Sequence, residues 1–183
     1  MTIFDRLIEH PIIGAINTDT IIQESPCEVF FILGGELSEL GDKIAELKAE
    51  KKLVFVHMDL IQGIKSDVAG LKYIKQVFNP TGIITTHSRL ISEAKSLGLF
   101  AILRLFLLDS KNLKSGIRLV EKCNPDAVEV LPGALHKATK LIIEETRTPV
   151  ISGGLIMDKE DVINSLKVGA IGVSTSNVSL WSI

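Results

Sequence analysis

Val-Glu-Val-Leu-Pro-Gly (128–133), Val-Ile-Ser-Gly-Gly-Leu (150–155) and Ile-Gly-Val-Ser-Thr-Ser-Asn (171–177) follow one another at a regular spacing in the last third of the chain. Each segment is a short apolar run that ends in small or polar residues, and a helical pattern separates it from the next. Such alternation predicts parallel strands that are joined by helices. The ends of these strands are where α/β proteins place small anionic ligands.

The same alternation extends through the whole chain. Eight evenly spaced βα units with right-handed crossovers predict closure into a barrel. The predicted fold is α/β, a compact single-domain (β/α)8 TIM barrel over 1–183 with abbreviated first and last helices; a doubly wound open sheet is the structural alternative. We expect strands at 12–16, 29–33, 53–59, 82–86, 100–107, 127–131, 149–152 and 170–174, and helices at 18–24, 37–51, 66–78, 88–97, 110–122, 134–146 and 159–168, with a stub at 178–181.

Composition limits the class of protein. Hydrophobic residues make up 46% of the 183 residues and charged residues 23%, as expected when a parallel sheet is buried on both faces. No apolar run reaches the ~18–20 residues of a membrane span and the N-terminus has no signal-peptide pattern, so we expect a cytoplasmic protein without membrane contact. The two cysteines predict neither a disulfide framework nor a metal site.

The net charge of −2 hides an uneven distribution of charge along the chain. Between Lys65 and Arg147 there are thirteen Lys and Arg residues against eight Asp and Glu residues. Chance and solvated helix faces are one explanation of this bias. A surface that faces a polyanion is the other, because fixed like charges focus the local field.

Charged side chains lie near the predicted C-terminal strand ends, which meet at one mouth of a barrel. Asp59 ends the third strand, Arg104 lies in the apolar fifth strand, and Glu129 lies between two valines of the sixth. A charge in such a strand is costly unless it is paired or bound to a ligand. Two explanations therefore stay open: an internal ion pair of Arg104 with Glu129 or Asp59, and contacts to the hydroxyl groups of a small polar ligand.

The loops after the seventh and eighth strands predict a phosphate site. The segments Gly153-Gly154 and Ser174-Thr175-Ser176 offer backbone N–H groups with little side-chain cover. Barrels commonly bind phosphate with these two loops. The alternative is that the glycines only ease tight turns between strand and helix.

The sequence predicts no catalytic residue, metal or cofactor. His57 and His87 are candidates for acid–base chemistry, but no nucleophile and general base form a recognisable pair. No strand carries an active-site lysine, which argues against Schiff-base chemistry. No group of His, Asp and Glu residues has the spacing of metal ligands.

Six strings in sequence order resemble the glycerol uptake operon antiterminator family. The resemblance covers the chain from about residue 10 to the C-terminus. The strings are His-Met-Asp-Leu-Ile-Gln-Gly-Ile-Lys (57–65), Gly-Ile-Ile-Thr-Thr (82–86), Arg-Leu-Phe-Leu-Leu-Asp-Ser (104–110), Glu-Val-Leu-Pro-Gly (129–133), Gly-Gly-Leu-Ile (153–156) and Ser-Thr-Ser-Asn-Val-Ser-Leu-Trp (174–181).

The resemblance implies a regulator and not an enzyme. Members of the family are barrel-shaped proteins that respond to glycerol 3-phosphate and act on leader mRNA, which allows transcription to pass a terminator upstream of glycerol-utilisation genes. The resemblance implies that the small-residue loops bind the phosphate and that the strand charges order the glycerol end. The expected ligand-binding residues are Asp59, Arg104, Glu129, Gly153, Gly154, Ser174, Thr175 and Ser176.

The resemblance also makes the basic half from Lys65 to Arg147 the candidate RNA face. Lys72, Lys75 and Arg118 are the residues expected to contact RNA. The family often has Arg at the position of His87. A phosphate-binding barrel enzyme, an isomerase or lyase acting on a small sugar or glycerol phosphate, is the alternative function. The expected partners are leader mRNA and a small phosphorylated ligand, with a homo-oligomer retained as a candidate assembly.

Overall fold

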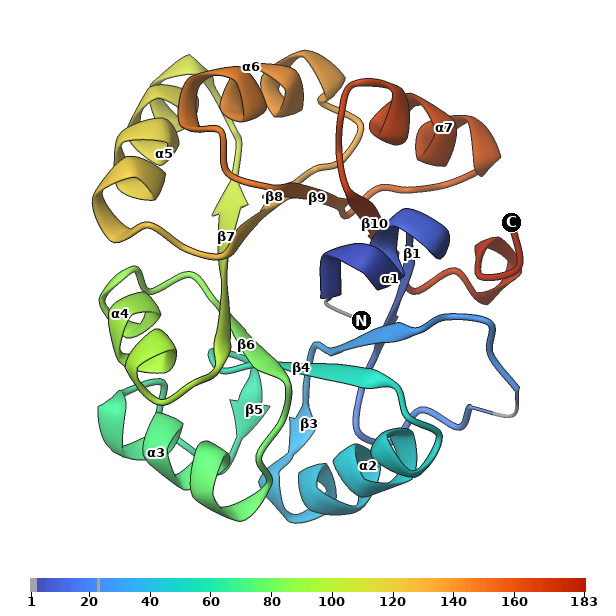
Figure 1. The fold of residues 1–183 in the computed structure, drawn as a ribbon, viewed down its shortest axis with the longest axis vertical. Coiled ribbons are helices and arrows are strands. Elements are labelled where there is room, and N and C mark those ends of the chain that lie inside the picture. The colour runs from blue at the N-terminus through green and yellow to red at the C-terminus, as the bar shows by residue number, and fades with distance from the viewer. Residues whose placement is uncertain (1–2, 23) are drawn as a thin grey trace.

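Eight parallel strands form a closed barrel in the computed structural model, which describes residues 3–22 and 24–183. The predicted barrel is confirmed, and an open sheet is excluded because β1 pairs with β2 on one side and with β10 on the other. The strands run around the barrel in the order β1-β10-β9-β8-β7-β6-β4-β2 (Figure 1). Their bounds are β1 (Ile12–Ile16), β2 (Val29–Ile32), β4 (Leu53–His57), β6 (Gly82–Thr85), β7 (Phe100–Phe106), β8 (Ala127–Leu131), β9 (Val150–Gly153) and β10 (Gly172–Thr175).

Helices surround the barrel, and α2 to α7 each connect one strand to the next. The carboxylates of Asp67 and Asp109 accept hydrogen bonds from backbone N–H groups in the first turns of α3 and α5, which fixes where these helices begin. Gly98 and Gly169 follow the ends of α4 and α7 with positive φ, as glycine allows. The helices are α2 (Leu37–Ala49), α3 (Val68–Val77), α4 (Arg89–Ser96), α5 (Ser110–Cys123), α6 (His136–Thr146), α7 (Lys159–Lys167) and the terminal 3-10 helix η1 (Val178–Leu180).

The helix predicted at 18–24 does not form. Residues 18–22 and 24 are turn and irregular chain, and residue 23 lies outside the described residues. The backbone N–H of Asn17 donates to the Thr20 hydroxyl at 3.0 Å, and the N–H of Thr20 donates to the Asn17 carbonyl at 3.2 Å. This local turn replaces helical hydrogen bonds, and β-branched threonine and isoleucine residues disfavour so short a helix.

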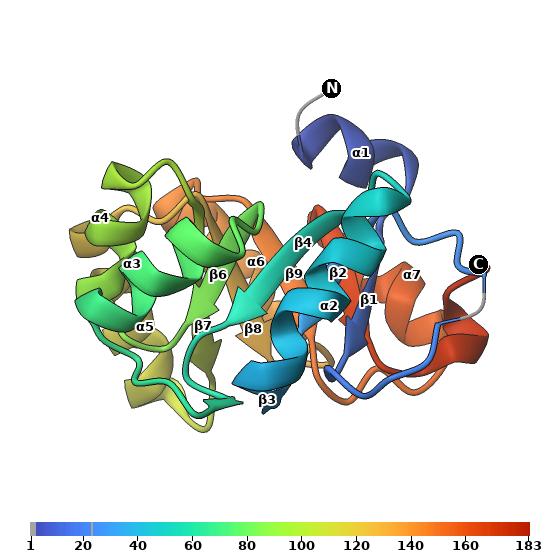
Figure 2. The ribbon, with the colours of Figure 1, turned by 90° about the horizontal axis from the view of Figure 1, so that it is seen from below.

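Helix α1 (Ile3–Glu9), which the sequence pattern did not predict, closes one end of the barrel. Its Ile3 and Leu7 are buried and belong to the interior cluster that includes Ile13, Phe31 and Phe55. Figures 1 and 2 show α1 across the N-terminal ends of the strands. The barrel is therefore filled and closed at this end, which leaves the opposite mouth for a ligand.

A small second sheet lies at the C-terminal mouth and was also not predicted. Strands β3 (Gly35–Glu36) and β5 (Ile61–Gln62) pair in parallel and fix the loops that follow β2 and β4. Figure 2 shows β3 at the end of the molecule opposite α1. None of the helices in the described part of the chain is long and apolar enough to cross a membrane.

Candidate functional site

A cavity of about 420 Å³ opens at the C-terminal mouth of the barrel. Its volume lies within the range of small-molecule sites. Three strands supply its polar wall, with Arg104 from β7, Glu129 from β8 and Ser174 from β10. The remaining lining comes from residues 154–157 and 175–177 and from the apolar side chains of Ala15, Leu33 and Leu131.

Arg104, Glu129 and Ser174 form a hydrogen-bonded row across the barrel interior. The Arg104 Nε donates to Glu129 Oε2 at 2.7 Å, and the Ser174 hydroxyl donates to Glu129 Oε1 at 2.7 Å. Arg104 and Glu129 lie opposite each other in the pairing of β7 with β8. The internal ion pair that the sequence left open is therefore present. Because both side chains also line the cavity, their contact with a ligand stays a prediction.

Gly153 makes room for this row. A Cβ atom on Gly153 would lie 2.5 Å from Ser174 Oγ and 2.7 Å from Glu129 Oε1. Real Cβ atoms do not approach that closely, so any other residue would displace the carboxylate or the hydroxyl. The absence of a side chain at Gly153 thus allows the hydrogen bond between Ser174 and Glu129 to form, in addition to easing the turn that follows β9.

The loops after β9 and β10 bring backbone N–H groups to the rim of the cavity. Gly154 and Leu155 turn the chain with φ values of 70° and 54°. Among residues 3–22 and 24–183, no hydrogen bond uses the N–H group of Gly154, Leu155 or Ser176. Such N–H groups at neighbouring loops are suited to the oxygens of a phosphate. The phosphate site at these loops stays a prediction.

The Thr175 hydroxyl, unlike these N–H groups, has a hydrogen-bond partner within the protein. It accepts a hydrogen bond from the Asn177 N–H at 3.1 Å, and the Thr175 carbonyl accepts from Trp181 Nε1 at 2.9 Å. The indole of Trp181 in turn packs edge-on against Phe30, with ring centroids 5.7 Å apart. The C-terminal segment therefore holds the end of β10 in place.

Asp59 lies outside the cavity lining. Its carboxylate accepts four hydrogen bonds, from the hydroxyls of Ser66 at 2.6 Å and of Thr85 at 2.7 Å and from the N–H and the hydroxyl of Thr86, each at 2.7 Å. Burial favours the neutral acid, but these hydrogen bonds outweigh it and lower the pKa of Asp59 to about 2. The carboxylate thus joins the loops after β4 and β6.

His57 lies on β4, and only 2% of it is exposed. Neither ring nitrogen has a hydrogen-bond partner in the described residues. Burial lowers the pKa of His57 to about 4, with a further contribution from the positive charge of Arg104. The imidazole is therefore neutral at physiological pH. His87, the other histidine considered for acid–base chemistry, is exposed after the end of β6.

The predicted RNA-contacting residues lie on the outer ring, away from the cavity. Lys72 and Lys75 are on α3 and Arg118 is on α5. Helix α4 lies between these two helices, as Figure 1 shows. Lys72 and Arg118 are exposed and Lys75 is partly exposed. The structure therefore places the three residues on one side of the barrel but not in a single patch.

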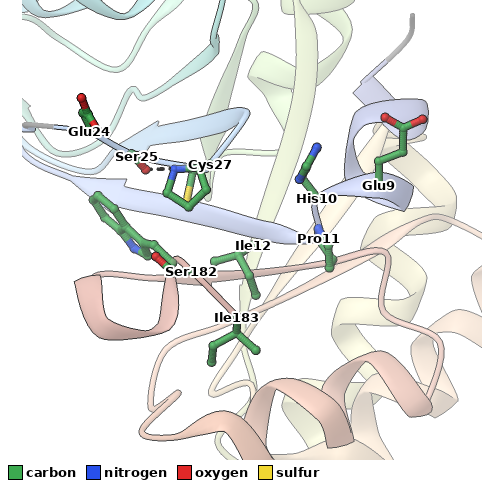
Figure 3. Close-up of a pocket in the computed structure, with 11 residues that line it drawn as sticks. Glu9, His10, Pro11, Ile12, Glu24, Ser25, Cys27, Ser182 and Ile183 are labelled. Atoms are coloured by element: carbon green, nitrogen blue, oxygen red, sulfur yellow. Dashed lines mark hydrogen bonds between the residues drawn. The ribbon is translucent and has the colours of Figure 1, made fainter.

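A second hollow, of about 580 Å³, lies at the other end of the strands. Figure 3 shows it between the end of α1, residues 24–27 and the C-terminal residues 181–183. None of the predicted site residues lines it. Conserved chemistry in barrels occurs at the C-terminal mouth, whereas this end contributes to stability. The cavity at the mouth is therefore the candidate site.

Sequence reasoning missed part of the cavity wall. Leu155, Met157 and Asn177 line the cavity although none was expected there. Their position in the sequence could have predicted this, because each lies a few residues after a strand that ends at the mouth. No group of three or more His, Cys, Asp and Glu residues in the described ranges could hold a metal ion.

Comparison with known proteins decides the family. A model of the family described as "Glycerol-3-phosphate responsive antiterminator" matches residues 12–181. The chain belongs to this family. This antiterminator-family chain is also 31% identical to the uncharacterised protein YgcP of Escherichia coli over all of its own length and 97% of that protein.

Two solved structures described as glycerol uptake operon antiterminator proteins are similar to this chain. A glycerol uptake operon antiterminator regulatory protein from Listeria monocytogenes superposes with a TM-score of 0.84 at 31% identity, over 93% of this chain and 94% of that one. A glycerol uptake operon antiterminator-related protein from Thermotoga maritima gives a TM-score of 0.85 at 34% identity, over 94% and 98% of the two chains. Barrel enzymes under 25% identical superpose as well, and they share the fold alone.

Proposed function

We propose that this antiterminator-family protein binds glycerol 3-phosphate and RNA, and that it regulates glycerol uptake and utilisation genes at the level of transcription termination. The family match across residues 12–181 carries the proposal. The cavity at the barrel mouth supports it, since one wall is charged and the other offers backbone donors. A protein that acts on nascent mRNA works where transcription occurs, so residence in the cytoplasm belongs to the proposal.

The ligand lies across the cavity in this proposal. Its phosphate accepts hydrogen bonds from the loops that contain Gly153-Gly154 and Ser174-Thr175-Ser176. Its glycerol hydroxyls face Arg104, whose guanidinium donates hydrogen bonds, and Glu129, whose carboxylate accepts them. Asp59 influences ligand binding indirectly, because its hydrogen bonds hold together the loops after β4 and β6. No cofactor or metal is needed for binding.

Leader RNA binds elsewhere, on the outer ring. The basic half from Lys65 to Arg147 includes the outer helices α3 to α6, where Lys72, Lys75 and Arg118 lie. RNA phosphates attract such a surface, and binding releases counterions, so affinity falls steeply with salt. Ligand and RNA thus occupy different surfaces, as a regulator requires.

A barrel enzyme acting on a small sugar or glycerol phosphate is the second candidate function. The observation that favours it is the buried neutral imidazole of His57, which has the chemistry of a general base. His57 does not line the cavity, however, and neither of its ring nitrogens has a hydrogen-bond partner in the described residues. The regulator therefore fits the geometry better.

Thermal unfolding measurements test whether the protein binds glycerol 3-phosphate. Glycerol 3-phosphate at millimolar concentration should raise the melting temperature through mass action, and glycerol should do so far less because it lacks the phosphate. Inorganic phosphate is the complementary control. An unchanged melting temperature with millimolar glycerol 3-phosphate would contradict the ligand assignment.

A titration of leader RNA with and without glycerol 3-phosphate separates the two functions. A regulator should bind RNA with an affinity that depends on salt and on the ligand. An enzyme should instead convert the compound, which product analysis by nuclear magnetic resonance detects. Turnover without RNA binding would favour the enzyme.

A further inference from the structure

Helix α5 carries a line of cations along its outer face. Lys111, Lys114, Arg118 and Lys122 are three or four residues apart, which places them on one side of a helix. All four are exposed, and none forms an ion pair or a side-chain hydrogen bond within residues 3–22 and 24–183. Charges without intramolecular partners leave a local positive field in solution.

A shallow hollow of about 340 Å³ lies on this face of the helix. Its lining combines three cations with two hydroxyl groups and contains no carboxylate. Guanidinium, ammonium and hydroxyl groups are the side chains that contact nucleic-acid phosphates most often. The lining residues are Ser110, Lys111, Lys114, Ser115 and Arg118.

We propose that this α5 basic face (Lys111, Lys114, Arg118 and Lys122) binds the phosphate backbone of leader RNA. The inference rests on the proposed function and narrows its RNA surface to one helix. Arg118 is the one member that was expected to contact RNA. The cations of α3 lie beyond α4 and contribute to the long-range field only.

The ligand cavity is connected to the α5 basic face through residues 107–109. Strand β7 carries Arg104, and only these three residues separate its end from the start of α5. The N–H of Leu107 donates to the carbonyl of Leu131 at 2.8 Å, and Leu131 lines the cavity together with Arg104. Residues 107–109 thus lie between the cavity wall and the first turn of α5. If the ligand shifts this segment, ligand and RNA change each other's affinity by the same factor.

Two variants with equal loss of charge test the location. Lys114→Gln/Arg118→Gln removes two charges from the α5 basic face, and Lys72→Gln/Lys75→Gln removes two from α3. We expect the α5 variant to bind fluorescently labelled leader RNA about tenfold more weakly and to reduce the slope of log affinity against log salt by about 1.5, since each lost phosphate contact removes roughly 0.7–0.9. The α3 variant should lose less than about threefold, because only the long-range field changes.

The outcomes separate this inference from the proposed function. Equal losses in the two variants, or unchanged RNA binding in the α5 variant, would overturn the α5 assignment while leaving an RNA-binding protein. Wild-type protein with no salt-dependent RNA binding would overturn the proposed function itself.

Two further measurements guard against a folding defect. The melting-temperature rise with glycerol 3-phosphate should persist in both variants, because neither changes the cavity. Lys114→Arg/Arg118→Lys keeps both charges and should retain RNA affinity. Loss of RNA binding in this charge-conserving variant would contradict a contact that is mainly electrostatic.

Discussion

The guanidinium of Arg104 donates to the carboxylate of Glu129 at 2.7 Å inside the barrel, where only 6% and 1% of the two residues are exposed. Burying two charges costs desolvation energy of the same order as the gain from their attraction and hydrogen bonds. The intact pair therefore contributes little net stability. Because both residues line the cavity, the ion pair also holds two charged groups in fixed positions before a ligand binds.

We expect Glu129→Gln to lower the free energy of unfolding by about 3 kcal/mol, because the Arg104 guanidinium would stay buried without a compensating charge. Urea denaturation measures the change. Glu144→Gln is the matched control, since Glu144 pairs with Lys140 at 3.7 Å on the exposed surface of α6. That substitution should cost no more than about 0.5 kcal/mol. Similar small losses in both variants would show that the interior pair is not buried in solution.

Asp59 should stabilise the fold in a pH-dependent way. Its pKa is lowered to about 2, so its contribution is complete above the ordinary value of 3.8 and is lost as the pH falls through about 2. We expect Asp59→Asn to lower the free energy of unfolding by about 2 kcal/mol at neutral pH and to approach wild type at the acid end of this window. Asp42→Asn on the exposed face of α2 is the control and should change little at any pH. A difference between Asp59→Asn and wild type that is constant with pH would contradict the shift.

His57 should destabilise the fold on acidification. Burial and the charge of Arg104 lower its pKa to about 4, while Asp59 acts in the opposite direction. Between the ordinary pKa of 6.5 and about pH 4, the His57 side chain is protonated in the unfolded chain but not in the folded protein. The free energy of unfolding therefore falls as the pH is lowered from about 6.5 to about 4, and this group changes it no further below pH 4. The fall from this group should be about 3 kcal/mol. His57→Gln, which does not titrate, should flatten that part of the stability profile, whereas His10→Gln at an exposed position should not.

The barrel could be predicted because its strands are buried on both faces. Segments such as Val150–Gly153 and Gly172–Thr175 read as apolar runs that end in small residues, and helical patterns separate them. The prediction of a helix at 18–24 was wrong because the turn between Asn17 and Thr20 is held by one side-chain and one backbone hydrogen bond, which hydrophobic periodicity does not reveal. Helix α1 was missed because it is short and its apolar positions find their partners only inside the closed barrel.

The site could be predicted only in part, for a related reason. Strand alternation predicts Asp59, Arg104 and Glu129 at one mouth. Arg104 and Glu129 line the cavity there, whereas Asp59 lies in the loop after β4 and outside the lining. Which charges pair depends on which strands are neighbours. Arg104 lies next to Glu129 because β7 pairs with β8, whereas Asp59 meets Thr85 and Thr86 because β4 pairs with β6. These contacts between distant parts of the chain follow from the closed topology and not from local sequence.

Gly153 offers the sharpest test of the cavity. Gly153→Ala would place a methyl group 2.5 Å from Ser174 Oγ and 2.7 Å from Glu129 Oε1, so the row of hydrogen bonds must move. We expect a loss of about 2 kcal/mol in the free energy of unfolding from this overpacking. We also expect the rise in melting temperature with glycerol 3-phosphate to shrink to less than half of the wild-type rise.

Gly98→Ala supplies the control for Gly153→Ala. Gly98 has a φ of 69° and no atom within 4 Å of the added Cβ, so the substitution strains the backbone by about 1 kcal/mol without touching the cavity. This variant should keep the full rise in melting temperature with glycerol 3-phosphate. If Gly153→Ala also kept it, the ligand would bind away from Glu129 and Ser174, and the charged wall of the cavity would need a different explanation.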